Sequence, residues 1–387
     1  MAITGTITSS ADVSTEWWNG RKLVRKNNGE LWCCYNFYNP TTTKYEIRCA
    51  YSANDGLTWT EEIVVADASN TYNGPTLAID RQGNLHLAYG YWVSARHTDN
   101  RIKYRKRTTA WSDEEEPETH TAGGGAAIAI DSIGDIHLAY EANHPTLGKI
   151  NIRYIKKTSA GWQTGEWVSE ISGAYEQHYQ AIALDSQDNI HVVWEGTGWG
   201  TNITKYQILY RKRTSSGWET TEEVTDSTTN QWHPNIAIDK QNNVHLAWAY
   251  GGSYRKRTSL GWGDEETIPF TSPSDLNIAV DLHDKPIVIA EDTISGVTQL
   301  TYSQRNGAWS IPVAITSGSS DNYAPIMIWA RQPGYQNRPK RGFALIFYVV
   351  PASGDYLISY YSDVAWNRYA GNIVIDQLIY QHAERMR

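Results

Sequence analysis

Apolar and polar positions recur along the chain in one short pattern. An apolar run ends at Asp-x-x-Gly-Asn or a close variant, and an alternating run such as Leu-His-Leu-Ala-Tyr follows it. This order of apolar run, turn and alternating run predicts a β-hairpin in each copy. The copies are "LVRKNNGELWCCY" (23–35), "LAIDRQGNLHLAY" (77–89), "IAIDSIGDIHLAY" (128–140), "IALDSQDNIHVVW" (182–194), "IAIDKQNNVHLAW" (236–248) and the weaker "IAVDLHDKPIVIA" (278–290).

A second pattern follows each hairpin, with Tyr and Trp seven or eight residues apart. Its copies are "YSANDGLTW" (51–59), "YRKRTTAW" (104–111), "YIKKTSAGW" (154–162), "YRKRTSSGW" (210–218), "YRKRTSLGW" (254–262) and "YSQRNGAW" (302–309). Gly, Ser, Thr and Asn between the Tyr and the Trp favour a turn. The pattern therefore predicts a third strand, a second turn and a fourth strand that begins at the Trp.

Four antiparallel strands in about 50 residues are typical of one blade of a β-propeller. The sequence predicts an all-β fold, a seven-bladed β-propeller in a single domain over 1–387. The last blade has two candidates for its fourth strand, residues 2–8 and residues 372–380, and a ring closed by a terminal strand leaves no open edge. The predicted blades cover roughly 18–65, 72–117, 123–170, 176–226, 231–270, 274–315 and 322–380.

Composition and charge narrow the kinds of partner that the protein is expected to bind. The net charge of −8 argues against nucleic acid, and no apolar stretch is long enough for a membrane span. The first residues lack a basic region followed by an apolar run, so no secretory signal is expected. No cofactor is expected, and the spacing of the non-repeated histidines neither supports nor excludes a zinc site. The neighbouring Cys33 and Cys34 point to opposite sides of one strand, and with Cys49 they are expected to be buried free thiols.

One family resemblance stands on particular residues. "SANDGLTW" (52–59) resembles the Asp-box, Ser-x-Asp-x-Gly-x-Thr-Trp, with Asn54 at the aspartate position. That box, also called the BNR repeat, marks the turn between third and fourth strands in sialidase-like propellers. The repeated hairpin is also similar to that of bacterial seven-bladed propellers, some of which are polysaccharide lyases. The resemblance implies a ligand site on the rim that carries the loops between blades and between second and third strands, here named the loop rim.

The repeated polar residues are predicted to be scaffold. His86, His137, His191 and His245 hold one position after the first turn, where a buried histidine would bond to a neighbouring turn. The aspartates of those turns are expected to accept backbone hydrogen bonds two residues on. The basic "YRKR" runs are expected to pair across strands with the acidic fourth strands of their own blades.

Non-repeated residues of the loop rim are the candidate site, because function concentrates on loops of a rigid scaffold. Residues just before each first strand, such as His178 and His233, should face the central depression. The candidate ligand-binding residues are Tyr72, Asn73, Trp92, His97, Glu176, Trp199, Gln231, Trp232, His233 and Tyr323. The candidate catalytic residues, relevant if the protein is an enzyme, are His178, Tyr179, His144 and Arg96.

Several functions remain open. Aromatic faces with amide and carboxylate groups suit sugars, so the first hypothesis is a glycan-binding propeller with an oligo- or polysaccharide partner, extracellular or on a virus or phage particle. A polysaccharide lyase would use His178 or His144 as base, Tyr179 as acid and Arg96 or Arg101 to neutralise a uronate. A sialidase-like hydrolase is disfavoured, because only Arg21 loosely matches that family's first arginine. The fourth hypothesis is a protein-interaction or assembly propeller, and the oligomeric state stays open.

Overall fold

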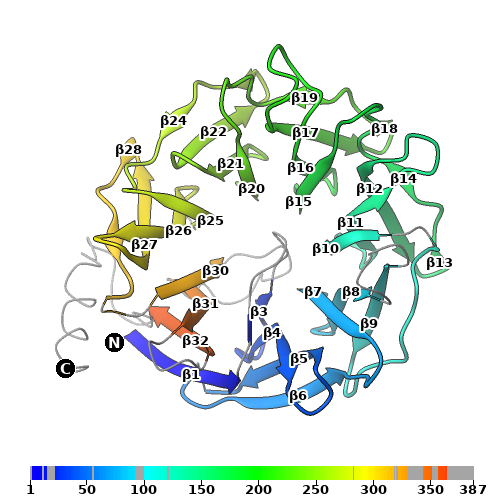
Figure 1. Cartoon of the computed structure of the whole chain (residues 1–387), viewed down its shortest axis with the longest axis vertical. Helices are drawn as coiled ribbons and strands as arrows, with labels where there is room; N and C mark the ends of the chain where they lie inside the picture. Colours follow the sequence, from blue (N-terminus) through cyan, green and yellow to red (C-terminus); the bar gives the residue numbers. More distant parts are fainter. Residues whose placement is uncertain are drawn as a thin grey trace.

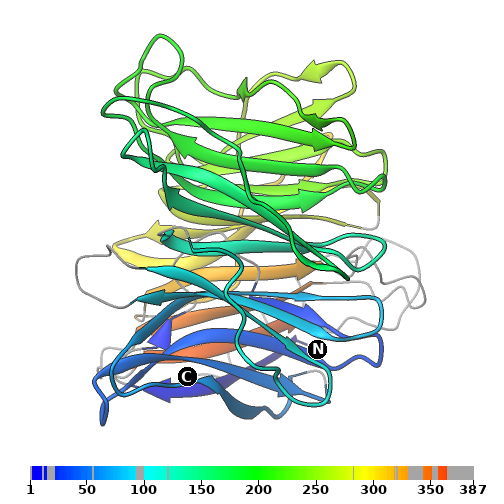
Figure 2. The same ribbon diagram turned by 90° about the vertical axis from the view of Figure 1, so that its right-hand side faces the viewer.

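The computed structural model describes residues 2–10, 13–14, 22–54, 56–92, 100–119, 122–281, 283–317, 319, 321–329, 343–350 and 356–363. Their strands form seven antiparallel sheets arranged as a ring (Figure 1). Seen from the side, the sheets stack face to face and their strands run between the two rims (Figure 2). In this described part of the chain, no helix is long and apolar enough to cross a membrane.

The strands follow the chain order around the ring. Sheet 1 contains β2 (Val13–Ser14), β3 (Leu23–Arg25), β4 (Leu31–Asn39), β5 (Lys44–Ser52) and β6 (Thr60–Val65). Sheet 2 contains β7 (Thr71–Ile79), β8 (Leu85–Trp92) and β9 (Arg101–Arg107). Sheet 3 contains β10 (Ala122–Ile130), β11 (Ile136–Asn143), β12 (Ile150–Thr158), β13 (Gly161–Trp162) and β14 (Glu166–Trp167). Sheet 4 contains β15 (Gln177–Leu184), β16 (Ile190–Gly196), β17 (Gln207–Thr214), β18 (Gly217–Trp218) and β19 (Glu222–Glu223).

The ring continues through the second half of the chain. Sheet 5 contains β20 (Trp232–Ile238), β21 (Val244–Ala249), β22 (Ser253–Thr258), β23 (Gly261–Trp262) and β24 (Glu266–Thr267). Sheet 6 contains β25 (Pro273–Val280), β26 (Pro286–Ile294), β27 (Val297–Asn306), β28 (Ala308–Trp309) and β29 (Val313–Ala314). Sheet 7 contains β30 (Asp321–Trp329), β31 (Phe343–Val350), β32 (Tyr356–Asp363) and the N-terminal β1 (Ala2–Ser10).

The fold is an all-β propeller, as predicted, but the blades are not uniform. Six sheets have four or five strands and form complete blades. Sheet 2 has three strands, and only the isolated bridges Tyr104↔Glu115 and Arg107↔Trp111 lie where the other sheets have a fourth strand. The prediction of four strands in every blade is therefore wrong for residues 72–117. The residues after Trp111, "SDEEEPE", contain no run of β-branched residues. Because charged residues are poor strand formers, this stretch explains why sheet 2 lacks a fourth strand.

The last sheet joins the two ends of the described chain. β1 pairs antiparallel with β32, from Ala2 opposite Asp363 to Ser10 opposite Tyr356. The N-terminal strand therefore takes the outer place in sheet 7, and the competing residues 372–380 lie outside the described residues.

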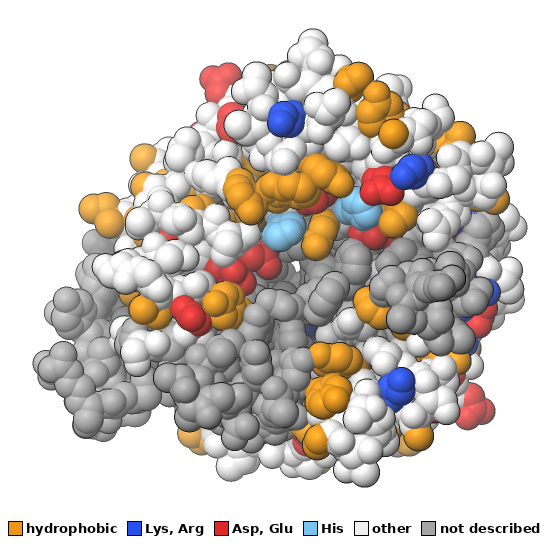
Figure 3. All heavy atoms as spheres, in the orientation of Figure 1, with side chains coloured by type: hydrophobic (Ala, Val, Ile, Leu, Met, Phe, Trp, Pro, Cys, Tyr) orange, Lys and Arg blue, Asp and Glu red, His pale blue; other side chains and the backbone are white. Residues whose placement is uncertain are grey.

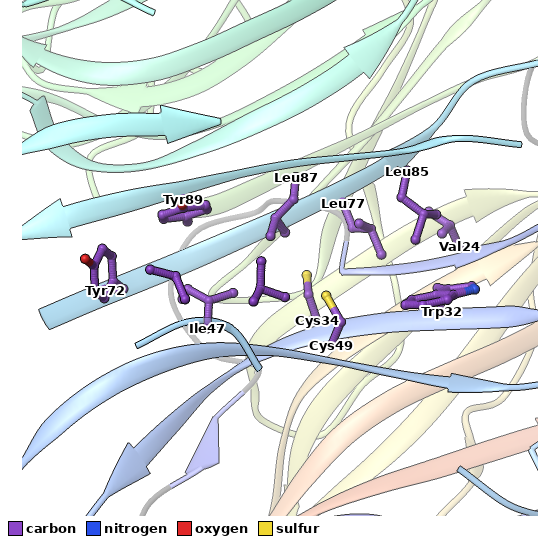
Figure 4. Packing of buried hydrophobic residues seen from close by; sticks show 12 residues of the cluster. Val24, Trp32, Cys34, Ile47, Cys49, Tyr72, Leu77, Leu85, Leu87 and Tyr89 are labelled. Atoms are coloured by element: carbon purple, nitrogen blue, oxygen red, sulfur yellow. The ribbon is translucent and has the colours of Figure 1, made fainter. Parts of the chain in front are cut away.

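Apolar faces of neighbouring sheets pack on each other and form the core. Between sheets 1 and 2, Trp32, Cys34 and Cys49 pack against Leu77 and Leu87 (Figure 4). Equivalent clusters lie between sheets 2 and 3, 3 and 4, 4 and 5, and 5 and 6. All three cysteines are buried and free, which confirms that prediction.

The four repeat histidines are buried scaffold, as predicted, with exposures of 1–2 %. In sheet 4, His191 Nδ1 lies 2.6 Å from the Tyr210 hydroxyl, and its Nε2 lies 3.2 Å from Asp185 Oδ2. His86, His137 and His245 make the same two contacts with the Tyr and Asp of their own repeats. The second oxygen of Asp185 accepts the N–H groups of Gln187 and Asn189, which closes the turn as predicted.

The basic runs do pair with acidic fourth strands, but those strands belong to the preceding sheet. Glu222 of sheet 4 accepts two hydrogen bonds from Arg257 of sheet 5, at 2.8 and 2.7 Å, and one from the Trp262 indole at 2.7 Å. The Trp262 ring also meets Tyr210 edge-on at 5.4 Å. Related pairs join Glu62 to Arg107, Glu115 to Lys157, Glu166 to Arg213 and Glu266 to Arg305. The repeat of Tyr, Lys/Arg and Trp thus ties adjacent blades together, and the prediction of pairing within one blade is wrong for these pairs.

Candidate functional site

The innermost strands of sheets 4 and 5 carry β-bulges on the loop rim. The register shifts between His178 and Ala181 in sheet 4 and between Trp232 and Asn235 in sheet 5. The bulge residues Tyr179 and His233 both have a φ of 52°. Bulky residues seldom adopt this left-handed backbone, and such strain tends to mark functional positions. His178 and His233 were predicted just before the first strands, and they lie instead within β15 and β20.

Five aromatic side chains come together at these bulges, and we name them the aromatic cluster: His178, Tyr179, Tyr206, Trp232 and His233. The rings of Tyr179 and His233 have centroids 4.6 Å apart, and those of Tyr206 and Trp232 are 4.3 Å apart. His178 lies 6.3 Å from Tyr206. All five are partly exposed. Figure 3 shows two histidine side chains bordering the centre of this face, with hydrophobic and acidic side chains beside them.

Two buried glutamates hold the bulges from the preceding strands. Glu141 of β11 accepts the Tyr179 N–H at 3.0 Å and lies 3.1 Å from His178 Nδ1. Glu195 of β16 accepts the His233 N–H at 2.5 Å. Their side chains are 1 % and 0 % exposed, so each is a carboxyl group removed from water. A buried carboxyl group is costly unless paired, and these contacts supply partners for both oxygens of Glu141 and for one oxygen of Glu195.

The electrostatics of His178 follow from its neighbours. Burial lowers its pKa, but the hydrogen bond to Glu141 and the charges of Glu141, Glu195 and Glu176 outweigh burial and raise it to about 9. His178 is therefore a cation at neutral pH, and it would act as an acid rather than as a base.

Glu195 and His233 are shifted towards their neutral forms. Burial raises the pKa of Glu195 to about 8, against the hydrogen bond from the His233 N–H and the charge of His178, which lower it. Burial also lowers the pKa of His233. The Oε1 atom of Glu195 and the Nδ1 atom of His233 lack hydrogen-bond partners among the described residues. Perturbed groups gathered on one rim are typical of a functional site.

Other predicted ligand-binding residues prove to be buried and structural. Tyr72 is 5 % exposed and packs in the core between sheets 1 and 2. Asn73, also 5 % exposed, accepts hydrogen bonds from Asn36 and from the Gly74 N–H. Gln231, 7 % exposed, accepts the indole N–H of Trp248 at 2.7 Å. These side chains have little surface to offer a ligand.

The remaining candidates are spread over the loop rim. Trp199 is partly exposed and donates its indole N–H to Gln177, while Glu176 lies 3.2 Å from Lys149 and 3.6 Å from His178. His144 accepts two N–H groups of its own turn through Nδ1, and its ring lies 4.3 Å from Trp167. His144 is therefore part of its turn rather than of the aromatic cluster. Trp92 and Tyr323 are partly exposed at β8 and β30, and Arg96 and His97 lie outside the described residues.

Sequence reasoning missed Tyr206 and Glu141 and assigned no role to Glu195. A signal for the two glutamates was present. Each follows the aromatic residue that ends a repeat, where sheets 2 and 5 have Gly90 and Ala249. Among the described residues, no group of three or more His, Cys, Asp and Glu side chains has the arrangement of a metal site.

Comparisons with known proteins support the fold. No protein-family model matches the chain, and no curated protein matches it. An α-L-arabinanase of Penicillium chrysogenum, solved with arabinobiose, has a TM-score of 0.57 and 14 % identity over 79 % of this chain and 98 % of that one. A PL25 ulvan lyase bound to -[GlcA(1-4)Rha3S]- has a TM-score of 0.55 and 13 % identity over 90 % and 95 %.

A third similar structure is the NanB sialidase of Streptococcus pneumoniae, with a TM-score of 0.51 and 11 % identity over 92 % of this chain and 70 % of that one. At such identities the likeness establishes the fold alone. The chain is a β-propeller, and its structural neighbours include carbohydrate-active propeller enzymes.

Proposed function

We propose that the protein binds an uncharged oligosaccharide on the loop rim, over the aromatic cluster of sheets 4 and 5. The observation that carries the proposal is the packing of Trp232 on Tyr206 at 4.3 Å beside the Tyr179–His233 pair, all partly exposed. Sugar rings have apolar faces that pack on aromatic rings and hydroxyl groups that need polar partners. Glu176 and the imidazoles of His178 and His233 would supply those partners.

The charge around the cluster favours an uncharged sugar. Two cations near it pair with carboxylates, His178 with Glu141 and Lys149 with Glu176. Asp275 lies 3.8 Å from His233 Nδ1 and adds negative charge. A uronate or sialate carboxylate would meet these carboxylates, and His178 or Lys149 would have to leave its partner to neutralise it, which costs binding free energy.

The proposal is tested by measuring binding to a panel of neutral and acidic oligosaccharides by calorimetry. Trp232→Ala is expected to weaken binding of the best ligand at least tenfold, which corresponds to about 1.4 kcal/mol, because it removes the largest ring of the cluster. Leu260→Ala is the matched control, because Leu260 is 97 % exposed on the opposite rim. Unchanged affinity in Trp232→Ala, or a preference for acidic glycans, would refute the proposal.

A second candidate function is a polysaccharide lyase, and one observation favours it. The Nδ1 atom of His233 lacks a hydrogen-bond partner in the described structure, and burial lowers the pKa of His233. A neutral imidazole could take a proton while the His178 cation gives one to the leaving oxygen. Arg101, a predicted neutraliser, lies 3.5 Å from Glu116 instead. Absorbance of unsaturated product from a uronate polysaccharide would establish this function, and its absence over a broad panel would exclude it.

We also infer that sheet 2 is the incomplete seventh blade and that residues 52–59 form a variant Asp-box turn. Ser52 Oγ accepts the Gly56 N–H at 2.8 Å, and Asn54 Oδ1 accepts the Thr58 N–H at 2.9 Å. The Trp59 indole donates to the Gly56 carbonyl at 3.2 Å. If Asn54 acts for the missing aspartate, Asn54→Asp should leave stability unchanged in urea unfolding, and Asn54→Ala should lower it. Equal stability of the Ala variant would refute this assignment.

A further inference from the structure

The aromatic cluster depends on contacts that cross from one sheet to the next. Tyr179 of sheet 4 is held through its N–H by Glu141 of sheet 3, and His233 of sheet 5 by Glu195 of sheet 4. Both bonds end on a bulge residue with φ of 52°. In sheet 2 the equivalent bulge position is Gly74, which adopts a φ of 57° without the strain that a side chain would add. The bulky residues in sheets 4 and 5 therefore need an external support.

We propose that Glu141 and Glu195 are positioning residues of the ligand site, each fixing the bulge that presents a ring to the ligand. This inference rests on the proposed function. The rings of the two bulge residues, Tyr179 and His233, form one tilted pair with centroids 4.6 Å apart, here named the platform. The two glutamates therefore act on one platform from two sheets. With side chains 1 % and 0 % exposed, neither glutamate touches the ligand itself.

The two glutamates support the platform through different chemistry. Glu141 also faces His178, whose other charged and titratable neighbours are Glu176, Glu195 and Tyr206. Its charge therefore keeps His178 protonated, as the raised pKa of His178 indicates. Glu195 faces His178, Glu141 and Asp275 as well as the His233 N–H, and burial raises its pKa to about 8. Near neutral pH Glu195 is therefore mostly an uncharged acceptor of one N–H group.

This difference gives the inference a sharp signature in variants. Glu195→Gln keeps a neutral group with an oxygen that accepts the His233 N–H, so ligand affinity should stay within about twofold of wild type. Glu195→Ala removes the acceptor, and affinity should fall about tenfold or more. Glu141→Gln removes a charge, so affinity should fall and the titration of His178 should move from about 9 towards its ordinary pKa.

The experiment measures oligosaccharide affinity by calorimetry for these three variants, together with NMR of the His178 imidazole and of the Tyr179 and His233 amides. Asp185→Asn is the control, because Asp185 bonds to His191 in the turn after β15, at the opposite end of that strand from the bulge. It should lower the melting temperature and leave affinity unchanged. A purely structural role would instead make Glu195→Ala resemble this control, with a lower melting temperature and wild-type affinity.

The outcomes separate the inference from the proposed function. If wild-type protein binds oligosaccharide and Glu195→Ala binds equally well, the positioning role is wrong while the proposed function stands. If the wild type binds no oligosaccharide, the proposed function is wrong, and with it the inference that the two glutamates position a ligand site. The amide signals cover the case in which Glu195→Ala is too unstable for calorimetry: a His233 amide that keeps its wild-type shift in Glu195→Gln at neutral pH supports the positioning role. A His233 amide whose shift does not respond to titration of Glu195 in the wild type overturns it.

Discussion

The substitution Tyr210→Phe tests whether the buried repeat residues stabilise the blades as the geometry implies. It removes one oxygen atom, the hydroxyl that lies 2.6 Å from His191 Nδ1, and leaves the ring in place. Tyr210 and His191 are 0 % and 2 % exposed, so water does not replace the lost partner. Because Asp185 accepts from Nε2, the neutral imidazole uses Nδ1 to accept the tyrosine proton.

The expected loss follows from leaving His191 Nδ1 without a partner. A buried acceptor without a partner costs about 1–3 kcal/mol, so the free energy of unfolding should fall by that amount. Urea unfolding followed by circular dichroism measures it, with an unchanged slope showing that the denatured state is the same. Tyr104→Phe, Tyr154→Phe and Tyr254→Phe should behave alike, because their hydroxyls lie 2.7 Å from the corresponding histidines.

The control and the refuting result are equally specific. Tyr250→Phe removes the same atom from a ring that is 60 % exposed, and the free energy of unfolding should change by less than about 0.5 kcal/mol. Losses below about 0.5 kcal/mol in all four buried variants would show that the hydroxyl–imidazole contact contributes nothing beyond ring packing. That result would refute the assignment of these residues as polar scaffold.

Three further predictions concern charge. The pKa of His178 in the folded protein is above its ordinary value, so the stabilisation from His178 is complete below pH about 6.5 and is lost as pH rises through about 9. Over that rise the wild type should lose up to about 3 kcal/mol of unfolding free energy relative to His178→Gln. Parallel curves of unfolding free energy against pH for the two proteins would contradict this. Burial lowers the pKa values of His86, His191 and His245, so their contribution to stability is present above pH about 6.5 and is lost on acidification. In His191→Gln this loss of stability in acid should shrink, and an unchanged acid limb of the stability curve would argue against it. Glu222→Gln should lower the free energy of unfolding in urea by about 1 kcal/mol, and by less at high salt. The control is Glu219→Gln, because Glu219 is exposed. Equal stability of the two variants would show that the bonds of Glu222 to Arg257 and Trp262 do not stabilise the contact between sheets 4 and 5.

The repeat made much of the fold predictable. Equal spacing of the turn aspartate, the histidine and the Tyr–Trp pair predicts hairpins and blades, because each unit must bury the same apolar face. The pattern also predicts that His191 is buried scaffold, since the four equivalent histidines lie in four different blades and cannot all belong to one catalytic centre. It does not predict that Arg257 pairs with a glutamate of the preceding blade, because the order of the strands in the sequence shows which strands are neighbours within one sheet but not which residues of the adjacent sheet lie opposite.

The candidate site was predictable only in outline. Its rim and two of its histidines follow from residues that depart from the repeat, such as His178 and His233. Tyr72, Asn73 and Gln231 also depart from it, yet they are buried, because a non-repeated residue fills a local gap as readily as it binds a ligand. Burial and the direction of a side chain depend on the bulge, and a shift of one residue at a bulge sends a side chain to the other face.

The pairing of β1 with β32 sets the order of events during synthesis. Of the described strands, β1 leaves the ribosome before the others, and its partner strand, residues 356–363, follows only after all the intervening sheets. At roughly 5–20 residues per second, the wait is on the order of 20–70 s. Throughout that time β1 lacks the strand that pairs with it, while the sheets that follow it are already able to stack. Closing the circle is therefore the last step of assembly, and a nascent chain stalled before residue 356 would keep an unpaired strand exposed to other chains.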